Sequence, residues 1–96
     1  RMDQFLYQCD DTYITVCSDV FSSAFAPGVS APQSLGLDPE IVLPLIKHVL
    51  RTRKVRGFDI CEISPRFDQD NTTANLGAVI IFAVVNTLCR LNGLSI

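Results

Sequence analysis

Three reactive or charged side chains end two apolar, strand-like segments of this 96-residue chain. Cys17 and Asp19 end the first segment, and Glu62 ends the second. In an open α/β sheet, polar sites form at the carboxyl ends of parallel strands. Residues two apart on a strand point to the same face, so Cys17 and Asp19 could share a metal ion if both belong to the strand. The pattern therefore marks this edge of the expected sheet as a candidate site.

Each of these residues also has a simpler interpretation. A cysteine at a strand end is commonly a buried apolar side chain, and an aspartate there commonly caps a loop. A carboxylate such as Glu62 at a strand end often partners a loop or a helix N-terminus. His48 is the single histidine, and we expect it to be partly exposed in the middle of a helix. Spacing alone therefore leaves both interpretations open.

The hydrophobic pattern predicts the elements that position these residues. Strands are expected over Thr12–Ser18 and Val55–Ile63, which are rich in β-branched and apolar residues. Asp38 is expected to cap a helix from Pro39 to Leu50, because proline suits the first position and two apolar stripes follow. A strand, a crossover helix and a second strand make a βαβ unit with parallel strands. The predicted fold class is therefore α/β.

Further helices and a loop complete the expected elements. Met2–Gln8 could be the tail of a helix. Thr72 to about Leu91 should form a closing helix, capped by Asn71 or Asp70, that is apolar nearly all round and so buried on several sides. Residues 20–36 should form a long ordered loop, and such loops are usually functional. The first strand is apolar or small on both faces, which is typical of a strand covered on both sides.

Composition narrows the function classes. With 48% hydrophobic residues and a net charge of −2, the chain can form one small core and suits neither disorder nor nucleic-acid binding. The basic run after the first long helix is interpreted as a solvated helix end. The longest apolar run, Leu76 to Val85, is too short to span a bilayer. The four cysteines lack a CxxC spacing and are expected to be reduced, in a cytoplasmic protein without a signal-peptide pattern.

The first of the two segments resembles a metal motif of the ureohydrolases, the arginase and agmatinase superfamily. Members carry an Asp-x-Asp-x-x-Asp motif whose first two aspartates bind a pair of manganese ions. Here the three positions hold Cys17, Asp19 and Ser22. The resemblance implies that Asp19 and Cys17 are metal ligands, with a thiol in place of one carboxylate. Manganese prefers oxygen ligands, while thiolates favour softer metals such as zinc.

The second segment carries the more specific motif. The family pattern Asp-x-x-Glu-x-x-Pro-x-x-Asp is matched in order by Asp59, Glu62, Pro65 and Asp68. The glutamate of that pattern lies against the guanidinium or amidine group of the substrate, and a carboxylate accepts two parallel N–H bonds from such a planar cation. The resemblance implies this recognition role for Glu62. The Gly-Val-Ser-Ala-Pro loop that begins at Gly28 resembles the formimidoylglutamase branch of the family.

The resemblance also implies a larger fold. An intact ureohydrolase is a three-layer α/β/α sandwich with parallel strands, and residues 1–96 would be the C-terminal portion of one such domain. The histidine ligands and the catalytic histidine of the family would lie before Arg1, in an N-terminal portion absent from this sequence. We therefore expect the isolated chain to be inactive and not to retain the two manganese ions of the intact enzyme.

The function that the resemblance implies is hydrolysis of N-formimidoyl-L-glutamate to L-glutamate and formamide in histidine degradation. A metal-activated hydroxide would attack the amidine carbon. Two alternatives stay open: an arginase or agmatinase that acts on a guanidinium, or a non-catalytic structural or binding module that has lost metal ligands. The expected partner is the small-molecule substrate, not nucleic acid or a membrane, and the resemblance is compatible with a homo-oligomer.

Overall fold

The computed structural model describes residues 1–94. Within them the helices and strands follow in the order α1 (Met2–Gln8), β1 (Thr12–Cys17), α2 (Pro39–Leu50), β2 (Val55–Cys61) and α3 (Thr72–Leu91). Short 3-10 turns, Ser18–Val20 and Pro65–Phe67, follow the two strands. The α/β class and the expected elements are confirmed. The strands end earlier than the pattern predicts, at Cys17 and Cys61.

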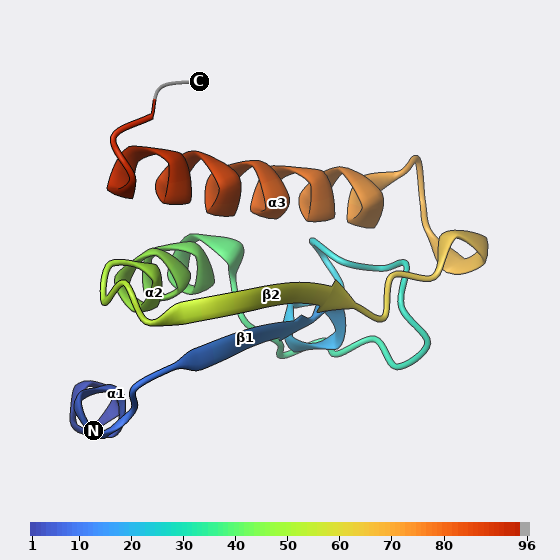
Figure 1. Ribbon diagram of the computed structural model, residues 1–96. Coiled ribbons are helices and arrows are strands. Elements are labelled where there is room, and N and C mark those ends of the chain that lie inside the picture. The colour runs from blue at the N-terminus through green and yellow to red at the C-terminus, as the bar shows by residue number, and fades with distance from the viewer. Residues whose placement is uncertain (95–96) are drawn as a thin grey trace.

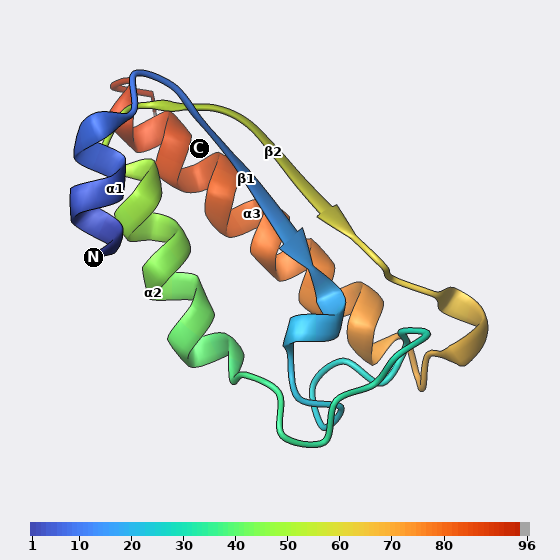
Figure 2. The same cartoon turned by 90° about the horizontal axis from the view of Figure 1, so that it is seen from below.

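The sheet consists of β1 and β2, which pair in parallel as expected of a βαβ unit. Both α2 and α3 lie on one face of this sheet (Figures 1 and 2). Ile14 and Val16 pack toward the core on that side, whereas Tyr13 and Thr15 on the other face are exposed. Neither α2 nor α3 covers this second face. The expected burial of β1 on both sides is therefore wrong for the described chain.

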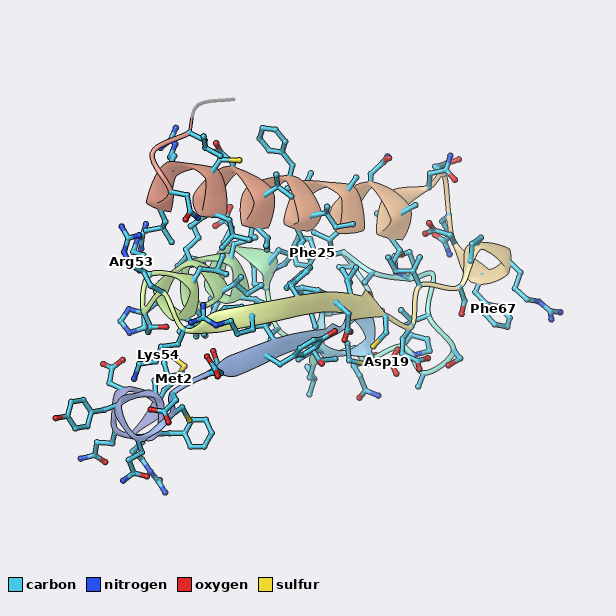
Figure 3. All side chains as sticks on the ribbon, in the orientation of Figure 1. Met2, Asp19, Phe25, Arg53, Lys54 and Phe67 are labelled. Carbon is cyan, nitrogen blue, oxygen red and sulfur yellow. The ribbon has the colours of Figure 1, made fainter. Side chains whose placement is uncertain are left out.

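The amino ends of the strands meet the basic residues that follow α2. The Lys54 ammonium donates a hydrogen bond to the carbonyl of Leu6 (2.6 Å), near the end of α1. The Arg53 guanidinium donates to the carbonyl of Leu91 (2.5 Å), the last residue of α3. Cations suit helix C-termini, where carbonyls lack intrahelical partners. The basic run is therefore more than a solvated helix end, because it ties α1 and α3 together at the end opposite Asp19 (Figure 3).

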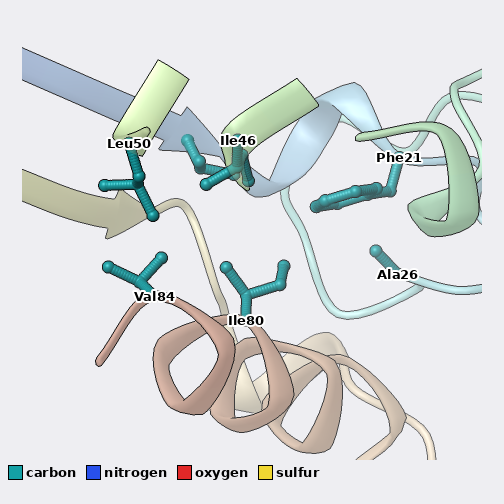
Figure 4. Close-up of a cluster of buried hydrophobic side chains, with 7 residues drawn as sticks. Phe21, Ala26, Ile46, Leu50, Ile80 and Val84 are labelled. Atoms are coloured by element: carbon teal, nitrogen blue, oxygen red, sulfur yellow. The ribbon is translucent and has the colours of Figure 1, made fainter. Parts of the chain in front are cut away.

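The hydrophobic core lies between α2, α3 and the loop that follows β1 (Figure 4). Its buried members are Val16, Phe21, Ala26, Ile46, Leu50, Ile80 and Val84. Phe21 is only 1% exposed, and burial of a phenylalanine side chain stabilises a fold by about 1.5–3 kcal/mol. The loop is therefore ordered, as predicted, because it contributes Phe21 and Ala26 to the core.

α3 is buried along one side only. The buried residues on its inner side are Thr73, Gly77, Ile80 and Val84. Its outer side exposes the apolar residues Val79, Ile81, Phe82 and Val85. The prediction that this helix is buried on several sides is therefore wrong for the described chain, and an apolar strip faces outward.

α3 is also long and apolar enough to cross a membrane, judged by length and composition alone. It has 20 residues, and the mean hydropathy of its best window is 1.7, with 17% of that window buried. The sequence expectation considered only the run from Leu76 to Val85 and so understated the apolar length. A helix that covers a sheet in a water-soluble core can pass the same test, so this property alone is weak support for a membrane span.

Asp68, rather than Asn71 or Asp70, caps the N-terminus of α3. Its carboxylate accepts hydrogen bonds from the backbone N–H groups of Thr73 (2.9 Å) and Ala74 (3.1 Å). Asn71 occupies the N-cap position without a side-chain capping bond. Burial alone would raise the pKa of Asp68, but these N–H donors outweigh it and hold the pKa of the carboxyl below its usual value of 3.8.

The same residues lock the loop after β1 to the start of α3. The backbone N–H of Gly28 donates to the Thr73 hydroxyl (2.7 Å), and the Gly28 carbonyl accepts from the backbone N–H of Ser64 (2.7 Å). A Cβ atom at Gly28 would lie 2.7 Å from the Asp68 side chain. Glycine is therefore required here by close approach, and we call the set Gly28, Ser64, Asp68 and Thr73 the loop latch.

Asp68→Asn should weaken the fold in a pH-dependent way. The folded-state pKa of Asp68 is lowered, so its contribution to stability is present above the unfolded value of 3.8 and is lost as pH falls through the folded pKa. The variant should therefore unfold at a lower denaturant midpoint than the parent chain near pH 7, and the gap should shrink toward about pH 3. Denaturant unfolding followed by far-UV circular dichroism at both pH values checks this.

Asp70→Asn is the matched control for that experiment. Asp70 is exposed and has a positive φ of 51°, a left-handed conformation that asparagine also adopts readily. It carries the same charge as Asp68, two residues away. A pH-dependent loss of equal size in both variants would mean that net charge, not the capping hydrogen bonds, is responsible.

Candidate functional site

Asp19 lies in the 3-10 turn Ser18–Val20 that begins where β1 ends. The alternation of a strand therefore does not extend to it, and the expectation that Asp19 shares a strand face with Cys17 is wrong. Its Oδ1 atom is buried and has no hydrogen-bond partner among the described residues. An unpaired buried carboxylate oxygen is costly unless a donor or a cation meets it. This orphaned oxygen at the carboxyl edge of the sheet (Figure 3) fits a metal ligand.

Glu62 immediately follows β2 and adopts a left-handed backbone conformation, with φ of 69°. This conformation ends the strand before Glu62, which explains why β2 is shorter than predicted. It costs a residue other than glycine about 1–2 kcal/mol, and such strained residues cluster at active sites and ligand clamps. The Glu62 side chain is exposed at the carboxyl edge. No local sequence signal predicts this conformation, because glutamate is not among the residues that favour it.

Cys61 is a candidate residue that the sequence analysis missed. It is the register partner of Cys17 across the parallel pair, so the two side chains lie next to each other at the ends of the strands. The Cys61 thiol also approaches the carbonyl of Val16 (3.7 Å). Burial raises the pKa of the Cys61 thiol, and the neighbouring Cys17 raises it further. Both cysteines end apolar strands, which was the available signal, but the register that joins them cannot be read from spacing.

Asp59 has a different surrounding from Glu62. Its carboxylate accepts a hydrogen bond from the Thr15 hydroxyl (3.2 Å) on the neighbouring strand. The hydrogen bond between Tyr13 and Asp59 also raises the pKa of the Tyr13 phenol. Asp59 therefore links the strands on the sheet face that α2 and α3 leave uncovered.

The remaining positions of the two family motifs, Pro65, Asp68 and Ser22, have structural roles in the loops and turns. Pro65 opens the 3-10 turn after β2, and Asp68 caps α3. The Ser22 hydroxyl contacts the carbonyl of Ser34 (3.4 Å) and the backbone N–H of Ala24 (3.3 Å). Ser22 therefore shapes its own loop, whereas the family motif has an aspartate at this position.

The described residues supply only part of a metal centre. Within residues 1–94, no three His, Cys, Asp or Glu side chains are grouped closely enough to hold a metal ion. His48 is exposed on α2, and its Nε2 lies 2.6 Å from Asp3 Oδ1, an interaction that lowers the pKa of Asp3. It therefore lies in the helix position expected for it and joins α1 to α2. Asp19 suits manganese, but the thiol of Cys17 does not.

Sequence comparison connects the chain to one family. The arginase family matches residues 1–86. A formimidoylglutamase from Clostridium tetani is 62% identical over 95 residues, which is 99% of this chain and 28% of that protein. A formimidoylglutamase from Legionella pneumophila is 44% identical over 86 residues, or 90% of this chain and 27% of that protein. The chain therefore spans little more than a quarter of the curated relatives that it matches.

Comparison of folds agrees with the sequence comparison. The agmatine ureohydrolase of Thermoplasma volcanium superposes with a TM-score of 0.81 at 28% identity, over 96% of this chain and 32% of that one. Proclavaminate amidino hydrolase from Streptomyces clavuligerus gives 0.77 at 33% identity, over 84% and 27%. Formimidoylglutamase from Bacillus subtilis gives 0.84 at 24% identity, over 91% and 27%, and supports the fold alone. With its parallel βαβα arrangement and a match over residues 1–86, the chain belongs to the arginase family.

Proposed function

We propose that this chain is the C-terminal portion of a ureohydrolase domain that hydrolyses N-formimidoyl-L-glutamate to L-glutamate and formamide, a reaction of histidine degradation in the cytoplasm. The observation that carries the proposal is the 62% identity to a formimidoylglutamase over 99% of this chain. Membership in the arginase family supports a hydrolase that acts on C–N bonds of linear amidines.

Glu62 would recognise the amidine group of the substrate. Its exposed carboxylate lies at the carboxyl edge of the sheet. The left-handed backbone conformation of Glu62 changes the direction of the chain where β2 ends. A planar amidinium presents two parallel N–H donors, which one carboxylate can accept together. The loop latch holds the turn that follows Glu62. The backbone N–H of Ser64, two residues after Glu62, donates a hydrogen bond to the Gly28 carbonyl. The strain at Glu62 would thus serve to fix its orientation toward the substrate.

Asp19 would hold a metal ion through its orphaned Oδ1 atom. The resemblance implies two manganese ions, which would supply an activated water for attack on the amidine carbon. The histidine ligands would come from outside the described residues, because His48 lies on α2 and is engaged with Asp3 of α1. The Asp19 carboxylate would lie at this edge, where a carboxylate can balance the positive charge of a cation.

Two other functions are supported by particular observations. Similarity to an agmatine ureohydrolase at 28% identity favours a guanidinium substrate, and the same carboxylate of Glu62 could accept a guanidinium. The thiol at position 17 favours a non-catalytic module. Manganese analysis of the intact parent protein separates this module from either enzyme, since a catalytic parent should bind two equivalents of manganese and a module none. Assays of formamide and urea release separate the two enzymes.

Glu62→Gln in the intact parent protein should impair productive binding of the amidine while leaving the fold unchanged. The substitution removes a charge and places an N–H donor where the substrate also donates. Loss of a charge-assisted hydrogen bond costs about 1.5–3 kcal/mol, or roughly a ten- to hundredfold drop in kcat/KM. Steady-state assays of formamide release measure this drop.

Asp10→Asn is the control for that substitution, because Asp10 is an exposed carboxylate before the amino end of β1. It should leave kcat/KM unchanged. Wild-type kinetics in the Glu62→Gln protein would remove Glu62 from the site.

The isolated 96-residue chain should not hydrolyse formimidoylglutamate and should hold no stoichiometric manganese. It contains no complete metal-binding group among its described residues. The apolar strip on α3, from Val79 to Val85, should also drive self-association, since contiguous exposed apolar surface does so. Formamide assays with added manganese, together with analytical ultracentrifugation, test both points. Turnover near the rate of an intact enzyme would show that the active site has been misplaced.

A further inference from the structure

Cys17 and Cys61 form a pair of reactive side chains at the carboxyl edge. They are register partners at the ends of β1 and β2, and each is half-buried. Side chains of registered partners in a sheet point to the same face, so Cys17 and Cys61 share one face. It is the face that also carries Thr15 and Asp59, two residues earlier on each strand. The family motif accounts for position 17 alone, so the second thiol is unexplained by the proposed function.

We propose that Cys17 and Cys61 supply two thiolate ligands to a thiophilic divalent cation, such as zinc, at the carboxyl edge of the sheet. This proposal rests on the proposed function in one respect, namely that a metal ion binds at the carboxyl edge of the sheet. It changes the cation that the edge prefers, from one bound by oxygen to one bound by sulfur.

The spacing of the strands suits a shared cation. Neighbouring strands lie about 4.8 Å apart. Two sulfur atoms at about 2.3 Å from one tetrahedral zinc ion are roughly 3.8 Å apart. Side chains that leave registered positions on one face need only a small inward lean to reach that separation. A disulfide requires the sulfur atoms to approach to about 2.04 Å, which demands a larger distortion of the pair.

The surroundings of the pair also favour a cation. The orphaned Oδ1 atom of Asp19 lies in the turn that directly follows Cys17. Within residues 1–94 no third His, Cys, Asp or Glu side chain is grouped with the pair, so water would complete the coordination of the cation. Zinc accepts sulfur and oxygen ligands in one site. Among the described residues, the Cys61 thiol contacts the carbonyl of Val16 at a long distance (3.7 Å) and hydrogen-bonds with the Cys17 side chain, so both of its contacts lie at the strand ends.

Cadmium titration of the reduced chain tests the proposal directly. Cadmium is a thiophilic probe whose thiolate complexes absorb in the ultraviolet, so the band reports sulfur ligation without any need for turnover. Far-UV circular dichroism first establishes that each sample is helical. The chain should develop a band that saturates at one equivalent, and denaturant should abolish it, because the register that pairs the thiols is then lost. A large excess of manganese should not displace the cadmium.

Variants assign the band to the pair. Cys17→Ser and Cys61→Ser should each remove at least half of its intensity and weaken binding. The double variant Cys9→Ser, Cys89→Ser should keep the band, because Cys9 follows α1 and Cys89 lies near the end of α3, away from the carboxyl edge (Figure 1). If either single serine variant fails to fold, the corresponding alanine variant replaces it. Loss of the amidine-hydrolysis activity of the parent would bear on the proposed function and not on this band.

Three results would overturn the proposal. The first is a band that does not depend on Cys61, and the second is displacement of cadmium by manganese. The third is rapid formation of a Cys17–Cys61 disulfide with oxidised glutathione in a chain that, when reduced, binds no cadmium. In that exchange the two thiols would lose two electrons and two protons while one glutathione disulfide is reduced to two thiols.

Cys17→Asp extends the test to metal preference. The substitution replaces a sulfur ligand with an oxygen ligand, so the intact parent protein should bind manganese more tightly and lose at least half of the cadmium band. Cys89→Asp is the matched control and should change neither. Manganese affinity can be followed by the paramagnetic relaxation of water protons. Unchanged manganese affinity and an unchanged cadmium band in the Cys17→Asp protein would show that Cys17 does not face the metals.

Discussion

The parallel pairing of β1 with β2 is the constraint on which the candidate site depends. It places Thr15 beside Asp59 and Cys17 beside Cys61, and it brings both strands to their ends at the same level. The chain then leaves the sheet through two different turns, a 3-10 turn that carries Asp19 and a left-handed residue, Glu62. A shift of one residue in this register would turn every side chain of one strand to the other face. The chemistry of the edge is therefore a consequence of strand register.

Strand pairing alone would not hold Glu62 in a strained conformation. Strain of this kind persists only where surrounding contacts over-determine the backbone. The loop latch provides such contacts, because the Gly28 N–H donates a hydrogen bond to the Thr73 hydroxyl and the Gly28 carbonyl accepts one from the Ser64 N–H. Asp68 fills the space beside Gly28 and fixes the start of α3. The two motif segments therefore hold each other in place through direct contacts, although nearly forty residues separate them in sequence.

Local features of the fold could be predicted from the sequence, and long-range features could not. The cap of α2 is an example of the first kind, since Asp38 accepts from the backbone N–H of Glu40 (2.8 Å) as its position beside Pro39 indicated. The cap of α3 was mispredicted, because Asp68 reaches forward over a turn whose shape depends on Gly28. Cys61 was overlooked for a related reason, since its partner lies 44 positions earlier. The local sequence pattern predicts the helices and strands, whereas the candidate site depends on how the two strands pair.

The second thiol distinguishes a changed metal site from a decayed one. Replacement of one carboxylate by Cys17 alone would weaken an oxygen-lined site without creating another. Cys61 is placed by register next to that replacement, and Asp19 keeps a buried carboxylate oxygen free for a ligand. A site under no constraint would not be expected to retain that costly oxygen while placing a second soft donor beside the first. The combination therefore favours a carboxyl edge that still binds a cation and has changed the class of cation it prefers.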